Sequence, residues 1–148
     1  MLIEKISPRF CETDALGHIS NTVLPMWFEQ AREPVFECFV PDLDPQKWNL
    51  IIAKIEVEFV HEIYYGRQVE IRTHLLKIGN SSMLIGQEAH QSGTLCARGR
   101  CTVVHYDYEL RQSVPIPDPI RERLEAHLVE TASSARPGIR GDRSAHGE

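Results

Sequence analysis

The sequence lacks any long hydrophobic run. No apolar segment in its 148 residues approaches the roughly 20 residues that a membrane-spanning helix needs. The first residues, Met1 to Ile6, also lack the charged-then-apolar order of a signal peptide. We therefore expect a cytoplasmic protein with no membrane span.

Motifs for disulfides, metal sites and serine hydrolases are also missing. The seven histidines fall in no H-x-x-x-H or H-E-x-x-H arrangement, so no metal site is predicted. No G-x-S-x-G elbow is present to support a serine hydrolase. The cysteines form no C-x-x-C pair, and we expect them to be small buried hydrophobic residues. They are Cys11, Cys38, Cys96 and Cys101.

Positive charge is in short supply, and the formal net charge is −5. This argues against nonspecific nucleic-acid binding. A chain of this length, with 42% hydrophobic residues, can bury one core but is too short for two ordinary domains. We expect one domain over residues 1–130. After it the Ser, Gly, Arg and Pro content rises and apolar residues nearly vanish, which predicts a disordered tail over residues 131–148.

One long amphipathic helix is predicted after Asn21. Apolar residues recur there at spacings of three and four, at Leu24, Trp27, Phe28, Ala31, Val35 and Cys38. Asn21 suits the N-cap, because its side-chain oxygen can accept from a backbone N–H one turn into the helix. Pro34 lacks the N–H that would bond the Gln30 carbonyl, so we expect a kink or break near Glu33.

Five segments have the pattern of β-strands. Residues 2–10 alternate weakly, and from Ile51 to Phe59 apolar residues alternate with charged ones, which predicts a half-buried strand. Three more strand segments follow, at residues 69–75, 82–91 and 95–107, and the first and last of them alternate in the same way. Because short turns separate the last four segments, they are expected to form an antiparallel meander.

The order of elements predicts an α+β fold. A helix with one apolar stripe buries that stripe by lying on a sheet, so we expect the long helix to pack on a five-stranded antiparallel sheet. Asp118 followed by Pro119 suits a helix start, with Asp118 as N-cap. Ile120, Leu124 and Leu128 then repeat at four-residue spacing and predict a short C-terminal helix.

The stretch from Asp14 to Asn21 brings a carboxylate close to the start of the long helix. A helix N-terminus offers unpaired N–H groups and about half a positive charge, which can polarise a carbonyl such as that of a thioester. An Asp shortly before a Gly also commonly bonds its own backbone two residues further on and forms a local turn. Both roles remain open for Asp14 from the residues alone.

A family resemblance favours the chemical role. The run Asp14-x-x-Gly17-His18-x-x-Asn21, followed by Trp27-Phe28-Glu29-x-Ala31-Arg32, resembles the signature of hotdog-fold acyl-CoA thioesterases of the 4-hydroxybenzoyl-CoA thioesterase-like family. The resemblance continues through Phe59, Glu62, Gly66, Ser81-Ser82 and Ala97, over roughly residues 3 to 117. It implies a hotdog fold and Asp14 as the catalytic carboxylate. Coenzyme A would then be part of the substrate, and no separate cofactor is expected.

Several other residues are weaker candidates. His18 could assist Asp14 or fix the loop, and His61 could reach a neighbouring subunit's site or simply end a strand. Arg98, Ser81 and Ser82 could contact the coenzyme A phosphates, since Arg is the preferred partner of phosphate oxygens. Related thioesterases carry basic residues where this chain has Gly79-Asn80-Ser81, and the outer sheet face could equally be solvated surface.

The leading hypothesis is hydrolysis of an acyl-CoA thioester. Asp14 would attack the carbonyl or act as general base on a water, while the Asn21 and Thr22 amides would stabilise the oxyanion. The alternatives are a hotdog hydratase or dehydratase, which needs a His with an acidic partner, and a noncatalytic acyl-binding or assembly protein. Because one helix covers one sheet face and leaves edges open, we expect a homodimer or homotetramer.

Overall fold

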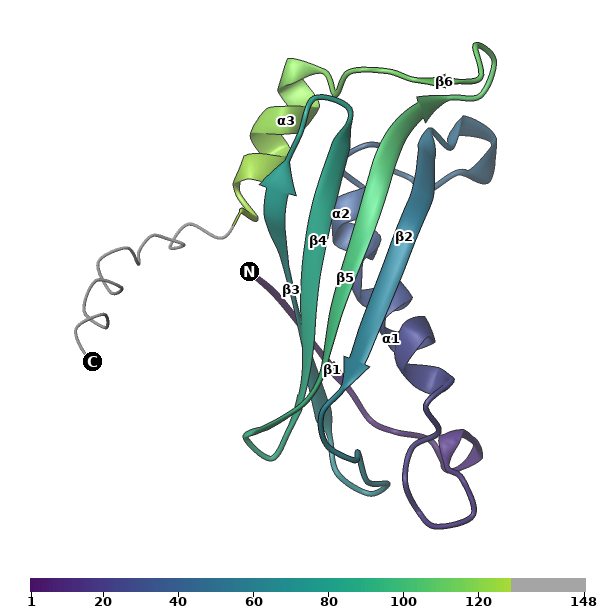
Figure 1. The fold of residues 1–148 in the computed structure, drawn as a ribbon, viewed down its shortest axis with the longest axis vertical. Helices are drawn as coiled ribbons and strands as arrows, with labels where there is room; N and C mark the ends of the chain where they lie inside the picture. Colours follow the sequence, from purple (N-terminus) through teal and green to yellow (C-terminus); the bar gives the residue numbers. More distant parts are fainter. Residues whose placement is uncertain (129–148) are drawn as a thin grey trace, which may run out of the picture.

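Residues 1–128 of the chain, as described by a computed structural model, form a curled antiparallel sheet that wraps around a central helix (Figure 1). The elements in chain order are β1 (Leu2–Ile6), the 3-10 helix η1 (Phe10–Glu12), α1 (Val23–Ala31), α2 (Glu33–Phe36), the 3-10 helix η2 (Pro45–Lys47), β2 (Leu50–Phe59), β3 (Val69–Ile78), β4 (Ser82–Gln91), β5 (Thr94–Asp107), β6 (Gln112–Ser113) and α3 (Asp118–Glu125). The predicted α+β fold is confirmed. The tail predicted at residues 131–148 lies outside the described residues.

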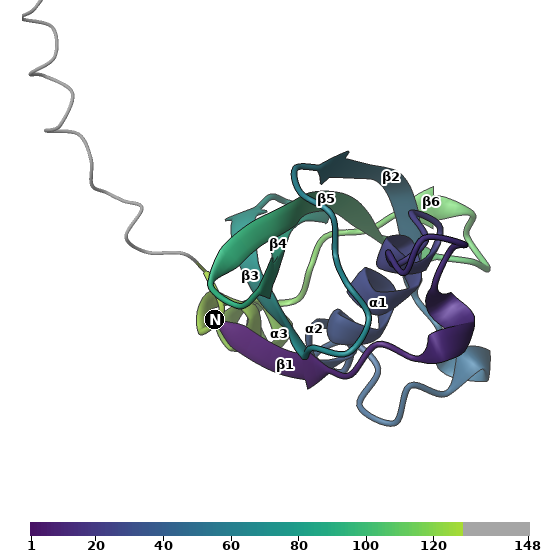
Figure 2. The same ribbon diagram turned by 90° about the horizontal axis from the view of Figure 1, so that it is seen from below.

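The strand order differs from the simple meander that the short turns predict. The sheet runs β1-β3-β4-β5-β2, and the short β6 pairs with the end of β5. Only β3, β4 and β5 form a meander. β2 pairs with β5, so residues 60–68 are a crossover from one side of the sheet to the other and not a hairpin turn (Figure 2). This crossover passes beside the loop that carries Asp14, and it supplies one wall of the candidate site.

The inner face of the sheet is apolar, as the alternation in β5 predicts. Cys101 and Val103 are each 1% exposed on the inner face, whereas Arg98 and Arg100 lie on the outer face. Helix α1 covers this inner face with its apolar stripe, and Phe28 is 1% exposed. A Cβ atom on Gly99 would lie 2.8 Å from Cε2 of Phe28. The glycine therefore lets the helix approach the sheet closely.

The prediction that β2 is half-buried is wrong for the single chain. Ile52, Ile55 and Phe59 lie on the inner side of the sheet, yet they are 41%, 48% and 52% exposed. A helix about 10 Å wide covers only two or three strands spaced about 4.8 Å apart. Because β2 is the edge strand beyond β5, α1 leaves most of it uncovered.

The predicted break in the long helix is confirmed at Arg32. Helix α1 ends at Ala31 and α2 begins at Glu33, with Pro34 in its first turn. The Arg32 side chain is 3% exposed, and its Nη1 atom donates to Oε1 of Gln87 at 3.2 Å. Nε2 of Gln87 donates in turn to the Phe28 carbonyl at 2.9 Å, so polar contacts satisfy backbone groups near the break.

The predicted helix caps are wrong at both helices. The residue before α1 is Thr22, which makes no side-chain cap, and Asn21 lies one residue earlier in the preceding turn. The Ser20 carbonyl accepts from the Val23 amide at 3.0 Å, so a hydrogen-bonded backbone turn leads into the helix. Helix α3 likewise starts at Asp118 itself, with Pro117 as its N-cap.

The cysteine prediction is correct for three residues and wrong for one. Cys38, Cys96 and Cys101 are buried free thiols, whereas Cys11 is an exposed free thiol in η1. Among residues 1–128 no helix is long and apolar enough to cross a membrane.

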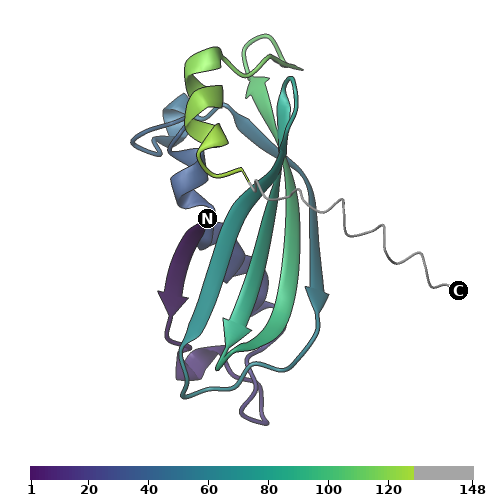
Figure 3. The same cartoon turned by 90° about the vertical axis from the view of Figure 1, so that its left-hand side faces the viewer.

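Helix α3 closes the end of the sheet opposite the Asp14 loop (Figure 3). Leu124 is fully buried, and Leu128 bridges to Leu75 of β3. Nη2 of Arg121 donates to the carbonyls of Gly79 at 3.0 Å and Asn80 at 3.2 Å. The short C-terminal helix therefore fixes the β3–β4 turn.

A buried carboxylate ties the loop before the site to helix α1. Glu12 is 7% exposed, and its side chain accepts from the Arg9 amide at 2.8 Å and from Nε1 of Trp27 at 3.2 Å. Burial by itself raises the pKa of Glu12, but the hydrogen bonds from Arg9 and Trp27 outweigh it and hold that pKa below its ordinary value. The Glu12 carbonyl also accepts from the Ser20 amide at 2.9 Å. Glu12 thus anchors both ends of the Asp14 loop.

We predict that Gly99→Ala destabilises the fold by about 1–3 kcal/mol, because the added methyl overlaps the Phe28 ring. Urea unfolding measured against the unmodified protein checks this value. The matched control is Arg100→Ala on the outer face of the same strand, expected to change stability by less than about 0.5 kcal/mol. Equal stability of Gly99→Ala and the unmodified protein would mean that α1 does not sit this close to β5.

We also predict that the stabilising effect of Glu12 depends on pH. Its pKa is lowered in the folded state, so the unfolded chain binds more protons and the contribution is complete above the unfolded value of about 4.3. As the pH falls through the folded pKa the contribution is lost. The stability difference between the unmodified protein and Glu12→Gln should therefore shrink on acidification, as measured by urea unfolding at a series of pH values. A difference that stays constant with pH would contradict this.

Candidate active site

A pocket of about 360 Å³ opens between the Asp14 loop, the start of α1 and the crossover after β2. Its floor is apolar and buried, and its mouth is polar. The lining residues are Asp14, His18, Ile19, Asn21, Leu24, Phe59, Val60, His61, Glu62, Ile63 and Cys96. The crossover and the Asp14 loop come from distant parts of the sequence, so the tertiary fold assembles this site.

Backbone hydrogen bonds join the two loops that form the pocket. The Ile19 amide donates to the Ile63 carbonyl at 2.8 Å, and the Tyr65 amide donates to the Gly17 carbonyl at 3.2 Å. Gly17 has a φ of +85°, a left-handed conformation that favours glycine. Ile19 and Ile63 are 8% and 4% exposed, so apolar packing holds this pairing from below.

The two oxygens of the Asp14 carboxylate have different surroundings. Oδ1 accepts from the Leu16 amide at 2.7 Å and from the His18 amide at 3.1 Å, which forms the local turn considered above. These hydrogen bonds, that from Leu16 foremost, hold the pKa of Asp14 below its ordinary value. Oδ2 accepts no hydrogen bond within residues 1–128, and the side chain is 42% exposed. An ionised oxygen is thus available at the pocket mouth.

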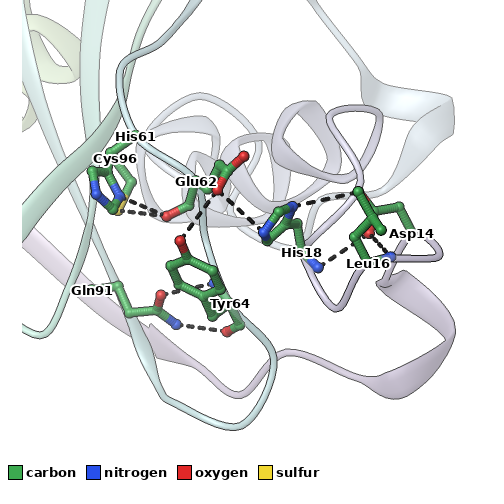
Figure 4. A network of polar contacts seen from close by, with 8 residues as sticks. All are labelled: Asp14, Leu16, His18, His61, Glu62, Tyr64, Gln91 and Cys96. Carbon is green, nitrogen blue, oxygen red and sulfur yellow. Dashed lines mark hydrogen bonds and ion pairs between the residues drawn. The ribbon is translucent and has the colours of Figure 1, made fainter.

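His18 stands between two carboxylates (Figure 4). Its Nε2 atom lies 3.2 Å from Oε1 of Glu62, and its Nδ1 atom lies 3.9 Å from Oδ2 of Asp14. The ring packs edge-on against Tyr64, with 5.1 Å between ring centroids. The structure therefore brings Asp14 and His18 together, as the sequence suggested, and it adds Glu62 to the same group.

Sequence reasoning did not identify Glu62, Tyr64 and Gln91 as one unit. The Tyr64 hydroxyl donates to Oε1 of Glu62 at 3.2 Å, and this carboxylate raises the pKa of Tyr64. Buried Gln91 accepts from the Tyr64 amide at 2.9 Å and donates to its carbonyl at 2.8 Å. The sequence gives two signals: Glu62 belongs to the family resemblance, and the Glu-x-Tyr spacing after β2 places two polar side chains on one side of an extended segment.

The two predicted oxyanion residues occupy different positions. Asn21 lines the pocket, whereas Thr22 is not among its lining residues. The Thr22 amide lies 3.4 Å from Oγ of Ser20, and the Val23 amide is bonded to the Ser20 carbonyl. Of the two predicted oxyanion residues, Asn21 is the one at the pocket.

His61 lies at the rim of the pocket and does not contact Asp14. Its Nδ1 atom is 2.9 Å from the Glu62 carbonyl, and its own amide donates to the Cys96 carbonyl at 3.0 Å. The imidazole is exposed within the single chain. Below it, burial raises the pKa of the Cys96 thiol, which contributes to the apolar floor.

The three candidates for coenzyme A contacts lie away from this pocket within one chain. Ser81 and Ser82 stand at the β3–β4 turn, at the opposite end of the sheet (Figure 1). Arg98 lies on the outer sheet face and pairs with Glu58 at 3.1 Å. The structure does not bring these three residues to Asp14. Over residues 1–128 it also groups no three His, Cys, Asp or Glu side chains that could hold a metal ion.

Solved structures of two bacterial proteins share this fold and are more than 25% identical in sequence to this chain. A protein from Bacillus stearothermophilus, described as a predicted thioesterase, is 42% identical, with a TM-score of 0.83 over 86% of this chain and 96% of that chain. A thioesterase from Thermus thermophilus, complexed with coenzyme A and Zn, is 26% identical, with a TM-score of 0.72 over 84% of this chain and 92% of that chain. The predicted hotdog fold with its short C-terminal helix is confirmed.

A curated relative and a family profile agree with these structures. The uncharacterized protein YsmA of Bacillus subtilis (strain 168) is 23% identical over 121 residues, which are 81% of this chain and 82% of that protein. Residues 8–124, which include the Asp14 loop, the crossover and the whole sheet after β1, match the profile of the Thioesterase-like superfamily. The chain therefore belongs to the Thioesterase-like superfamily.

Proposed function

We propose that this protein hydrolyses acyl-CoA thioesters and that Asp14 is its catalytic carboxylate. The observation that carries the proposal is the Oδ2 atom of Asp14, which is ionised, free of hydrogen bonds within the described residues and open to a pocket beside the start of α1. Superfamily membership supports the reaction class. Coenzyme A as the thiol carrier is supported by the Thermus thermophilus relative, which was solved as a complex with coenzyme A.

The pocket offers what thioester hydrolysis needs. The buried side chains of Leu24 and Ile63 provide an apolar surface for the acyl group. Asn21 and Leu24, at the start of α1, line the pocket, and the Asn21 amide and the positive end of α1 would stabilise the oxyanion that forms at the thioester carbonyl. The acyl carbon–sulfur bond breaks, a bond to oxygen forms, and the proton lost by water passes to the thiolate sulfur.

Asp14 can act by either of two routes. As a nucleophile, it would form a mixed anhydride with the acyl group, which water then hydrolyses. As a general base, it would take a proton from the water that attacks the carbonyl. Both routes use the free Oδ2 atom and leave Oδ1 in its turn with Leu16 and His18.

A hydratase activity is the second candidate, because the fold supplies the His–acid pair that such chemistry requires. His18 lies 3.2 Å from the Glu62 carboxylate. An enoyl-CoA in the assay panel separates the two reactions. Hydration would remove the conjugated double bond without releasing thiol, whereas hydrolysis would release thiol and keep the double bond.

We further propose that the functional unit is a homodimer or a larger even assembly. The outer edge of β2 has no strand partner within residues 1–128, and the apolar side chains of Ile52, Ile55 and Phe59 lie exposed beside it. A second copy pairing along this edge would cover them. Phe59 also lines the pocket, so the partner would approach the site itself and could bring its own Ser81, Ser82 or Arg98 toward a bound coenzyme A.

We predict that the purified protein releases free thiol from at least one acyl-CoA in a panel of short, long, branched and aromatic acyl groups. Asp14→Asn should lower turnover by roughly 10²–10⁴-fold, because an amide can neither attack the carbonyl nor accept the proton. The amide oxygen can still accept from the Leu16 and His18 amides, so the loop should keep its shape. A thiol reagent measures the release.

The matched control is Asp107→Asn. Oδ1 of Asp107 accepts from the Glu109 and Leu110 amides in a similar turn far from the pocket. This variant should keep full activity. Full activity of Asp14→Asn would refute the catalytic role of Asp14, and loss of folded structure in that variant would assign the residue to the turn alone.

We predict that light scattering gives a mass of two or four times 16.9 kDa. Ile55→Lys should shift the protein toward monomer and lower its specific activity, because it places a charge beside the proposed β2 interface. Ile3→Lys is the control, since Ile3 is 56% exposed on β1, the strand at the opposite edge of the sheet from β2. A fully active species of monomer mass would contradict this interface.

A further inference from the structure

The contacts of His18 fix which of its nitrogens carries a hydrogen. Nε2 of His18 lies 3.2 Å from Oε1 of Glu62, and a hydrogen on Nε2 makes this contact favourable because a carboxylate oxygen presents only lone pairs. The Tyr64 hydroxyl donates to the same Oε1 atom at 3.2 Å. In the neutral imidazole, Nδ1 of His18 is then a hydrogen-bond acceptor.

This acceptor faces a second acceptor across a short gap. Nδ1 of His18 and Oδ2 of Asp14 are 3.9 Å apart, which is too far for a direct hydrogen bond. Two hydrogen bonds of about 2.8 Å span that distance when they meet at an angle of about 90°. A water molecule matches this geometry, because it can donate one hydrogen to each acceptor. Its lone pairs would then point away from both acceptors.

Packing and hydrogen bonds hold the residues around this gap. The His18 ring packs edge-on against Tyr64 at 71° between ring planes, and Gln91 binds both the amide and the carbonyl of Tyr64. Gln91 is itself 4% exposed. The His18 amide donates to the other oxygen of Asp14 at 3.1 Å, which fixes the carboxylate relative to the imidazole.

We infer that Glu62 is a positioning residue that holds the hydrolytic water through His18. By accepting the Nε2 hydrogen, Glu62 together with Tyr64 keeps Nδ1 of His18 as an acceptor directed at Oδ2 of Asp14. The water sits between these two atoms with its lone pairs toward the pocket. This inference rests on the proposed hydrolysis of acyl-CoA thioesters and selects the general-base route for it.

The proton and bond changes balance without any other reagent. The water oxygen bonds to the acyl carbon and gives one proton to Oδ2 of Asp14, while Nδ1 of His18 holds the other hydrogen. The carbon–sulfur bond then breaks, and the proton on Asp14 passes to the departing thiolate. The products are the free acid and the thiol, and both side chains return to their starting states.

Three variants test the role of Glu62. Glu62→Ala should lower kcat by on the order of 10–10²-fold with little change in KM, because it loosens the aim of the water rather than substrate binding. Glu62→Gln keeps an oxygen that can accept from Nε2 and should restore most of the lost rate. In a His18→Ala background, Glu62→Ala should change kcat by less than about 2-fold, since Glu62 acts through His18.

The control is Glu56→Ala, which removes another exposed glutamate with an ion-pair partner, Lys54 at 3.5 Å, on the outer sheet face. It should keep the unmodified kcat. The Glu62 side chain is 59% exposed, so its removal should leave the melting temperature close to that of the unmodified protein. Two outcomes would overturn the inference. One is a kcat of Glu62→Ala equal to that of the unmodified protein. The other is a double variant in which the losses of Glu62→Ala and His18→Ala multiply.

A measurement independent of activity completes the test. In protein labelled with ¹⁵N-histidine, NMR should find the His18 hydrogen on Nε2. Glu62→Ala should give a mixture of the two tautomers. The spectrum of His18→Ala identifies which signal belongs to His18. A hydrogen fixed on Nδ1 in the unmodified protein would overturn the inference.

If no acyl-CoA is hydrolysed, the proposed function and the role of the water both fail. The tautomer measurement would still decide whether Glu62 positions His18.

Discussion

The candidate site depends on the backbone pairing between the Asp14 loop and the crossover after β2. The hydrogen bond from the Ile19 amide to the Ile63 carbonyl joins two segments that are far apart in the chain, and both side chains are buried beneath it. Glu12 reinforces the pairing from the other side by bonding Trp27 of α1. Every polar group of the pocket mouth is carried by one of these segments or by the start of α1. Without this pairing, His18 and Glu62 would not meet.

Asp14 has one carboxylate oxygen bound in a turn and the other free for the proposed chemistry. Two backbone amides donate to Oδ1 and shape the loop. They also lower the pKa of Asp14, which favours the ionised carboxylate. Oδ2 remains directed at the pocket and at His18. The two readings of Asp14 that the sequence left open, a turn residue and a reactive carboxylate, are therefore compatible. A turn that fixes one oxygen also fixes the direction of the other.

A single chain leaves the edge strand β2 of its sheet largely uncovered. Helix α1 covers the strands at the centre of the sheet and reaches the edge strand β2 only at Val57. The exposed apolar residues of β2 continue into the pocket wall at Phe59, so the uncovered edge and the candidate site adjoin each other. Exposed apolar edges are unfavourable in water, and this favours a second chain at this place. The same edge would thereby couple assembly to the shape of the pocket.

The sequence by itself determined the element types, the inner and outer faces of β3 and β5, the helix break just before Pro34 and the closeness of Asp14 to the start of α1. These features follow from local periodicity, proline chemistry and a motif whose residues are close in the chain. It did not determine the position of β2, the cap of α1 or the partners of His18. Strand pairing joins segments through hydrogen bonds that leave no local pattern, so the edge position of β2 and the crossover of residues 60–68 appear only in three dimensions. The contact between His18 and Glu62 is a consequence of that crossover, and only the tertiary structure could decide it.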